Sequence, residues 1–238
     1  MTNYDADSIL QSTEYRQEIA AQRSFMAGVY GWMTIGLLAT ALTALVVASS
    51  KELTHAVFDT GAFWVLLIAE VGIAIAFRMA LRAVPVAVAA GMFLVYSVLT
   101  GATLSILLLF YTRESVASTF FITAGMFAGI SAYGYVTKRS LDSVGSFCMM
   151  GLWGLIIASV VNIFVGSGAM SWLISFVGVI VFTGLTAYDT QKFKQAYAEG
   201  EPGSALQRKI ALLGAFELYL DFVNLFIYLL RFLGSRRD

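Results

Sequence analysis

Two aspartates lie inside apolar stretches of this sequence, where an ionisable side chain is costly. Asp189 lies near the end of the apolar run 171–188, and Asp221 lies in the middle of the next run, between Leu220 and Phe222. An aspartate at the centre of a membrane-spanning helix costs about 2.5–3.5 kcal/mol on insertion scales. Acids in such positions usually serve a proton or ion pathway and have a partner nearby. These two residues are therefore the first candidates for a functional site.

The chemistry of this pair depends on whether the two side chains touch. Two carboxyl groups within hydrogen-bond reach cannot both be ionised cheaply, so they share a proton. The protonated pair is a closed, singly charged latch, whereas the fully ionised pair offers oxygen ligands to a hard cation such as Ca²⁺. A Gly/Pro-containing loop near residues 200–204 joins the two runs, so their helices are antiparallel neighbours. Because Asp189 and Asp221 lie at different distances from this loop, contact requires the sixth helix to extend through Tyr197 or the seventh to begin with a kink.

Other polar residues accompany the pair. On the last run Glu217, Asp221 and Asn224 are spaced i, i+4 and i+7, so they share one helix face. That face must look into the bundle or into a water-filled cavity. Glu217 is either part of an ion pathway or an acid wetted by a cytoplasmic vestibule. Glu70, in the second run, is a further acid in an apolar segment, so Glu70, Glu217 and Asn224 are candidates for lining a path.

Basic residues near the acids give a second way to hold the pair closed. Arg78 and Arg82, at the end of the second run, are candidates for a latch on the ionised form. They are equally typical of plain anchoring at the cytoplasmic interface. Asp189 alone could also be an ordinary interfacial acid that pairs with Lys192 at i+3 or Lys194 at i+5.

The composition predicts a helical membrane protein. Of the 238 residues, 59% are hydrophobic and 13% are charged, whereas a soluble domain is about 45–50% apolar and about 25% charged. The 15 basic and 15 acidic residues give no net charge, so nothing indicates nucleic-acid binding. Cys148 and His55 are the single residues of their types, which excludes a disulfide framework and argues against zinc or haem. We expect no resident cofactor.

Seven apolar runs are long enough to cross a bilayer, which takes about 20 helical residues. We therefore expect an all-α, seven-transmembrane-helix bundle over residues 25–233, a polar cytoplasmic tail over 1–24, and a short C-terminal tail over 234–238. The N-terminal tail is expected to be a solvated terminus, with a short polar helix as the alternative. The predicted spans are 25–47, 62–80, 86–110, 116–136, 145–165, 171–190 and 210–233.

The distribution of Lys and Arg predicts the orientation. With the N-terminus in the cytoplasm, the inner segments hold ten basic residues and the outer loops hold only Lys51 and Arg113. The exceptions are Arg231, Arg236 and Arg237, which would lie outside unless the last segment only half-crosses the membrane. We therefore predict a cytoplasmic N-terminus and an external C-terminus.

Small residues are frequent in the spans. Gly125 and Gly129 form a GxxxG step, which lets helix backbones approach closely in a membrane. We expect this face of the fourth span to pack tightly against a neighbouring helix.

Several motifs together resemble one family. Residues 184–191 (GLTAYDTQ), 218–226 (LYLDFVNLF) and 229–231 (LLR) resemble the signature of the Bax inhibitor-1 family, the transmembrane Bax-inhibitor-motif proteins. Residues 30–33 (YGWM) and 133–139 (YGYVTKR) are similar to the bacterial branch. The similarity covers nearly the whole chain from about residue 25.

The resemblance implies a fold, a function and roles for particular residues. The implied fold is a seven-helix bundle with the last helix at its centre. The implied function is a pH-sensitive calcium leak in the cytoplasmic (inner) membrane, with Asp189 and Asp221 as the di-aspartyl sensor that also binds Ca²⁺ transiently. In relatives an arginine near the cytoplasmic end of the second helix contacts the sixth-helix aspartate, and a glutamate precedes it. Glu70 matches that glutamate, and Arg82 is preferred over Arg78 for the arginine, although neither falls at the expected offset.

Other functions are weighed against this one. Family members also modulate other membrane proteins, including a bacterial membrane protease, so a non-conducting regulator is the main alternative. An intramembrane aspartyl protease would share the Tyr188-Asp189 pair, but Asp221 follows Leu-Tyr-Leu instead of Gly-x-Gly, and we expect no enzymatic activity. A secondary transporter remains open, although the sequence has no clear inverted repeat or broken helix pair.

Overall fold

The computed structural model describes residues 3–81, 83–199 and 201–237, and this part of the chain is almost entirely helical. Among the described residues, seven helices are long and apolar enough to cross a membrane, which confirms the predicted fold class. The short α2 lies in the first connection after α1, and the 3₁₀ turn η1 follows α7. The helices are α1 (Asn3–Ser49), α2 (Lys51–Phe58), α3 (Ala62–Ala80), α4 (Val86–Phe110), α5 (Arg113–Val136), α6 (Asp142–Val165), α7 (Gly168–Ala196), η1 (Tyr197–Glu199) and α8 (Ala205–Leu233).

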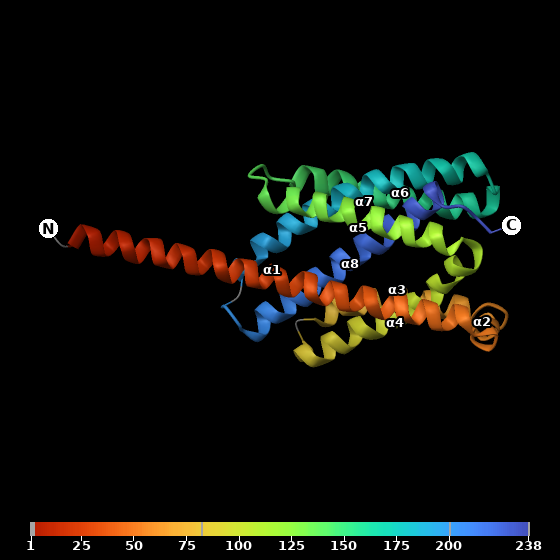
Figure 1. Cartoon of the computed structure of the whole chain (residues 1–238), viewed down its shortest axis with the longest axis horizontal. Coiled ribbons are helices and arrows are strands. Elements are labelled where there is room, and N and C mark those ends of the chain that lie inside the picture. The colour runs from red at the N-terminus through yellow and green to blue at the C-terminus, as the bar shows by residue number, and fades with distance from the viewer. Residues whose placement is uncertain (1–2, 82, 200, 238) are drawn as a thin grey trace.

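Local sequence signals set where the helices begin and end. The hydroxyl groups of Thr112, Ser167 and Ser204 accept hydrogen bonds from backbone amides at the first turns of α5, α7 and α8. Such capping satisfies amide groups that have no partner within the helix. Pro85 precedes α4, and Gly166 ends α6 in the left-handed conformation that glycine adopts readily. These connections are short, so consecutive spans run antiparallel (Figure 1).

The first helix differs from the expected solvated terminus. Residues 3–24 continue the first span as one helix of 47 residues, about 70 Å long. The segment has no Gly or Pro and is rich in Ala, Glu, Gln and Arg, which favour helix. Gln22 ties it to the bundle, because its side-chain amide donates a hydrogen bond to the Lys194 carbonyl at 3.2 Å. The helix therefore projects beyond the bundle at its N-terminal end (Figure 1).

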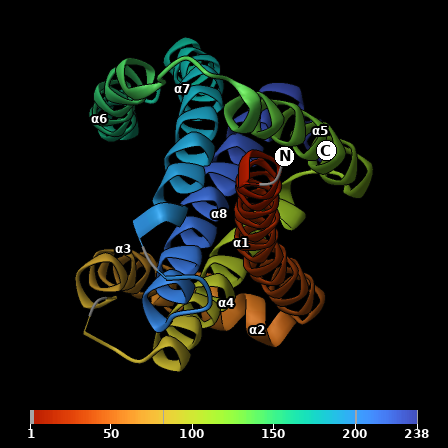
Figure 2. The same cartoon turned by 90° about the vertical axis from the view of Figure 1, so that its left-hand side faces the viewer.

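The last helix lies at the centre of the bundle, as predicted. Helix α8 packs against α7, α1, α5 and α4, and it is the most deeply buried of the spans. Its Phe216 ring contacts Phe77 of α3 and Phe93 and Tyr96 of α4, with centroids 4.6–5.8 Å apart. Figure 2 shows α8 surrounded by the other spans, with α6 outermost behind α7. Polar groups on α8 are therefore far from lipid.

The close helix contacts do not lie at the predicted GxxxG step. A Cβ atom added to Gly125 or Gly129 would meet no atom within 4 Å, so the prediction of tight packing there is wrong. Both glycines are exposed on the outer surface of α5. The close approach of α5 lies instead at Gly134, where an added Cβ would collide with the backbone of Ala187 on α7. Small residues facing lipid carry the same sequence pattern as small residues in a contact, which explains the error.

The two termini lie at opposite ends of the bundle, which agrees with complete crossing by α8 (Figure 1). Helix α8 has 29 residues, about 44 Å, so it is no half-crossing segment. After it, the chain folds back on the α4–α5 connection. The Arg237 amide donates to the Phe110 carbonyl at 2.9 Å, and the Thr112 amide donates to the Ser235 carbonyl at 3.1 Å. Which end faces the cytoplasm stays a prediction.

Candidate functional site

The structure brings the two predicted aspartates together inside the bundle. Asp189 of α7 and Asp221 of α8 lie within hydrogen-bond reach of each other. The two residues are only 8% and 4% exposed. Oδ2 of Asp221 is buried and has no hydrogen-bond partner among the described residues. A hydrogen bond between two carboxyl groups needs a proton on one of them, so a proton shared by this pair would join α7 to α8.

The different distances of the two aspartates from the connecting loop are absorbed in two ways. Helix α7 extends to Ala196 and is followed by the turn η1, Tyr197–Glu199, as contact between the aspartates requires. Helix α8 also runs obliquely across the bundle instead of parallel to α7 (Figure 1). Because α8 is tilted, Asp221 lies at the same depth as Asp189 although more residues separate it from the loop.

A third carboxylate and two cations surround the pair. Nζ of Lys192 lies 2.6 Å from Oε2 of Glu217 and 3.6 Å from Oδ1 of Asp189. Nη2 of Arg78, at the end of α3, lies 3.0 Å from Oε1 of Glu217. The Glu217 side chain is 6% exposed, so it is a buried ion-pair partner and not an acid wetted by a vestibule. The ion pairs thus connect α3, α7 and α8.

The charges of this cluster balance when the aspartates share one proton. Among the described residues, the main charged groups that act on Asp189 and Asp221 are Glu217, Lys192 and Arg78. Three acids therefore face two cations. One shared proton makes the cluster neutral, which is the state that a low-dielectric interior favours.

A cavity leads to the cluster from one end of the bundle. It has a volume of about 680 Å³ and lies where α3 ends, α7 ends and α8 begins. Lys192 and Lys209 line it together with apolar side chains such as Leu81, Leu206 and Ile210. Because Lys192 also contacts Glu217 and Asp189, the cavity gives water a route to the ion pairs.

The two remaining pathway candidates have other partners. Glu70 accepts a hydrogen bond from the Thr103 hydroxyl at 2.8 Å and a longer one from Thr100 at 3.5 Å, so it lies between α3 and α4. The Asn224 side-chain amide donates to the Leu220 carbonyl of its own helix at 2.8 Å. Neither residue is among the main groups acting on the aspartates. Of the three predicted path-lining residues, only Glu217 therefore belongs to the cluster around the aspartates.

Comparison with known proteins decides the family. A family model described as "Bax1-I: Inhibitor of apoptosis-promoting Bax1" matches residues 22–238. The chain belongs to the Bax inhibitor-1 family. The match covers the whole membrane-spanning part and both aspartates, so the resemblance of the motifs is confirmed.

Bacterial relatives within the Bax inhibitor-1 family are similar along their whole length. The inner membrane protein YbhL of Escherichia coli is 43% identical over 97% of this chain and 100% of its own. An uncharacterised protein of Borreliella burgdorferi is 42% identical over 97% and 100% of the two chains. An uncharacterised protein of Rickettsia prowazekii is 46% identical over 91% of each chain. The protein is therefore a multi-pass membrane protein of this family.

The arrangement of cations differs from the latch that the Bax inhibitor-1 resemblance implies. Arg78 forms its ion pair with Glu217 on α8 and acts on Asp189 only electrostatically. Arg82, the preferred match to the family's arginine, lies outside the described residues. Lys192 is the cation that joins α7 to α8. The contact of Lys192 with Asp189 can be predicted from their i+3 spacing in the sequence. No feature of the sequence predicts its contact with Glu217.

A resident metal centre is not formed by the described residues. No group of three or more His, Cys, Asp or Glu side chains lies close enough to hold a metal ion in that part of the chain. Ca²⁺ takes six to eight oxygen ligands.

Proposed function

We propose that this protein is a pH-sensitive calcium leak of the inner membrane, controlled by the charge of the Asp189–Asp221 pair. The observation that carries the proposal is the contact of two buried carboxyl groups from neighbouring helices, directly beside a buried ion-pair cluster. Ionisable groups inside a membrane bundle usually mark an ion or proton path. The inner-membrane location follows from the name of the E. coli relative.

In the closed state, ion pairs hold three helices together. Lys192 lies between Glu217 and Asp189, and Arg78 binds the other oxygen of Glu217. The Lys192 ammonium thus takes the position that a transported cation would need, next to carboxylate oxygens of both α7 and α8. With one proton on the aspartate pair, each cation has an acid partner and the cluster is neutral.

Acidification opens this arrangement. A second proton on the cluster removes a carboxylate partner from Lys192 or Arg78. A cation that loses its carboxylate partner no longer joins the helices, so the contact between α3, α7 and α8 weakens. Water then reaches the aspartates from the cavity beside Lys192, and Ca²⁺ passes through the weakened helix contact together with its water ligands. The ion pairs therefore give the leak a direction of pH dependence that the two aspartates alone do not specify.

No bond-breaking chemistry belongs to this proposal. An intramembrane protease needs space for a substrate backbone beside its two aspartates. Here Asp189 is 8% exposed and Asp221 is 4% exposed. The proposed role of the carboxyl groups is to bind protons and cations.

The test is Ca²⁺ flux into proteoliposomes that contain the full chain and a Ca²⁺-sensitive dye, between pH 5 and 8. We expect wild-type flux to be low at pH 8 and to rise toward pH 5. Asp189→Asn and Asp221→Asn should each flatten this pH dependence, because each removes one of the two groups that share the proton. Asp142→Asn, at an exposed acid on α6 that binds Ser140, is the matched control and should behave as wild type.

Two results would overturn the proposal. The first is folded wild-type protein that passes no more Ca²⁺ than empty vesicles at any pH. The second is an unchanged pH profile in both asparagine variants. The first result would favour the non-conducting regulator of another membrane protein, and co-purification from membranes would then be used to find that partner.

A further inference from the structure

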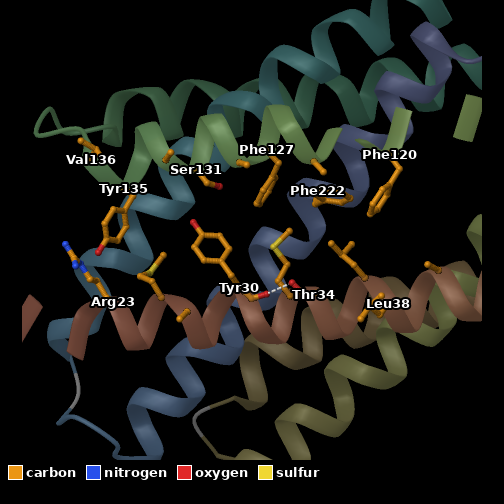
Figure 3. A pocket seen from close by; sticks show the side chains of 18 residues that line it. Arg23, Tyr30, Thr34, Leu38, Phe120, Phe127, Ser131, Tyr135, Val136 and Phe222 are labelled. Carbon is orange, nitrogen blue, oxygen red and sulfur yellow. Dashed lines mark hydrogen bonds between the residues drawn. The ribbon is translucent and has the colours of Figure 1, made fainter. Parts of the chain in front are cut away.

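A long apolar groove lies between α1 and α5. It has a volume of about 720 Å³, and Phe222 of α8 forms part of its floor (Figure 3). Helix α1 packs along α4 and α8, and α5 packs along α7 and α8, so the two helices flank the groove without filling it. Rim residues such as Leu38 and Phe120 are 58% and 39% exposed, so the groove opens on the outer face of the bundle.

The two ends of the groove differ in polarity. Among the described residues that line it, Arg23 carries the only charge, and it lies at one end beside Tyr135 (Figure 3). A second cation is close to this end, because Nζ of Lys194 donates to the Tyr135 carbonyl at 2.8 Å and lies 4.8 Å from the centroid of its ring. The opposite end, near Leu38 and Phe120, is apolar. The groove therefore has a cationic mouth and an apolar body.

The body of the groove lies in the membrane-spanning part of both helices. An apolar space that faces a bilayer is filled by acyl chains, because an empty space would lose dispersion contacts on every wall. The exposed small residues Ala27 and Ala128 line the groove and keep it wide. From Arg23 to Leu38 the helix rises about 22 Å, which exceeds one leaflet of a hydrocarbon core about 30 Å thick. A single acyl chain fits along this length.

From this polarity and position we infer that the groove binds an anionic phospholipid of the surrounding membrane. Its phosphate lies at Arg23 and its acyl chain lies along α1 and α5. Arginine binds phosphate through paired charge-assisted hydrogen bonds. Basic pockets between membrane helices at the cytoplasmic side are typical sites for anionic headgroups. The charge of the mouth selects for an anionic lipid over a zwitterionic one, while the apolar body accepts either.

Photo-crosslinking of lipids tests this site. The full chain is reconstituted into phosphatidylcholine vesicles that contain a small fraction of phosphatidylglycerol with a diazirine in its acyl chain. After illumination, mass spectrometry of peptides locates the labelled residues. We expect labels on the groove faces of α1 and α5, which unlabelled phosphatidylglycerol displaces and extra phosphatidylcholine does not.

Matched variants separate the headgroup contact from the acyl contact. Arg23→Gln should reduce groove labelling about tenfold, the effect of one charge-assisted hydrogen bond of about 1.5 kcal/mol. Arg208→Gln, at an exposed cation of the same end of the bundle, should leave it unchanged. Ala128→Phe should block the groove, whereas Ala76→Phe, at an exposed alanine of α3 outside it, should not.

The inference fails if labels spread over all lipid-facing helices alike, or if phosphatidylcholine competes as well as phosphatidylglycerol. It also fails if neither Arg23→Gln nor Ala128→Phe changes the labelling while both variants remain monodisperse after purification. Crosslinks between two copies of the chain across the groove, in place of lipid labels, would assign the groove to a protein contact and overturn the lipid site.

Discussion

Lys192 is the residue on which the closed arrangement depends most. Its ammonium group contacts acids on two helices, and its own side chain is 39% exposed toward the cavity at the end of the bundle. A cation so placed can leave its acids and reach water without a large movement of the backbone. It therefore acts as a tethered counter-ion that protons or Ca²⁺ can displace.

Replacing this cation should open the leak. In Lys192→Gln, Asp189 loses its ion pair on α7 and Glu217 keeps only Arg78, so we expect Ca²⁺ flux at pH 8 to rise toward the wild-type value at pH 5. The measurement is the proteoliposome dye assay. Lys194→Gln is the control on the same helix, because Lys194 donates to the backbone carbonyl of Tyr135. Equal flux in Lys192→Gln and wild type across the pH range would rule out a latch at this lysine.

The acids of the cluster should differ in their effect on stability. Glu217→Gln weakens contacts with two cations, so the free energy of unfolding should fall by about 1.5–3 kcal/mol, the range for hydrogen bonds to charged groups. Asp221→Asn removes a buried charge, and the new amide can still donate a hydrogen bond to Asp189, so its loss should be smaller. Thermal unfolding in detergent, followed by tryptophan fluorescence, compares them. A larger loss in Asp221→Asn would contradict this order.

At the residue scale the sequence identifies the aspartates but not their full surroundings. Asp189 and Asp221 are recognisable because acids in apolar runs are rare and costly. The contact of Lys192 with Glu217 depends on the tilt of α8, which no spacing within one helix encodes. The partners of Glu70 depend likewise on where α3 lies against α4. Contacts within a helix can be predicted here from spacing, whereas contacts between helices cannot, apart from the aspartate pair.

At the scale of elements, the contact between α5 and α7 positions Asp189. Gly134 of α5 lies directly against the backbone of Ala187, two residues before the aspartate. A side chain at this position must push the two helices apart, since neither backbone can yield locally. The α5–α7 contact is therefore a structural support of the site.

A methyl group added at Gly134 should destabilise the protein, whereas the same change at Gly129 should not. Gly134→Ala should lower the free energy of unfolding by about 1–3 kcal/mol, as overpacking usually does, and should alter the pH profile of flux. Gly129→Ala on the same helix meets no neighbour within 4 Å and should be neutral or slightly stabilising. The comparison uses unfolding in detergent and the flux assay. Equal effects of the two substitutions would disprove the contact.

The spans themselves are the most predictable part of the fold. The predicted bounds of α3 and α4 agree with the structure, because Pro85 and polar loops delimit their apolar runs. Helices α1, α7 and α8 extend several residues or more beyond the predicted spans. The apolar sequence ends at the membrane surface, whereas the helical backbone continues past it. For the same reason, the alternative of a polar helix holds for residues 3–24, and that helix is continuous with the first span.

At the scale of the whole molecule, the distribution of basic residues predicts which end faces the cytoplasm. Arg16 lies on the projecting part of α1, and Lys51 lies at the opposite end in α2. In intact E. coli cells a membrane-impermeant maleimide should label Lys51→Cys but not Arg16→Cys, which should react only after permeabilisation. The native Cys148 is buried and should contribute little background. The reverse labelling pattern would invert the proposed topology.

The central position of α8 has a consequence for biogenesis. A ribosome completes this helix after the six other spans, yet it packs against α1, α4, α5 and α7. Its two acids would be expensive to insert into lipid alone, so the earlier helices must wait in the membrane as an unclosed ring that offers Lys192 and Arg78 as partners. Variants that weaken the cluster should therefore accumulate in the membrane in smaller amounts than the wild type.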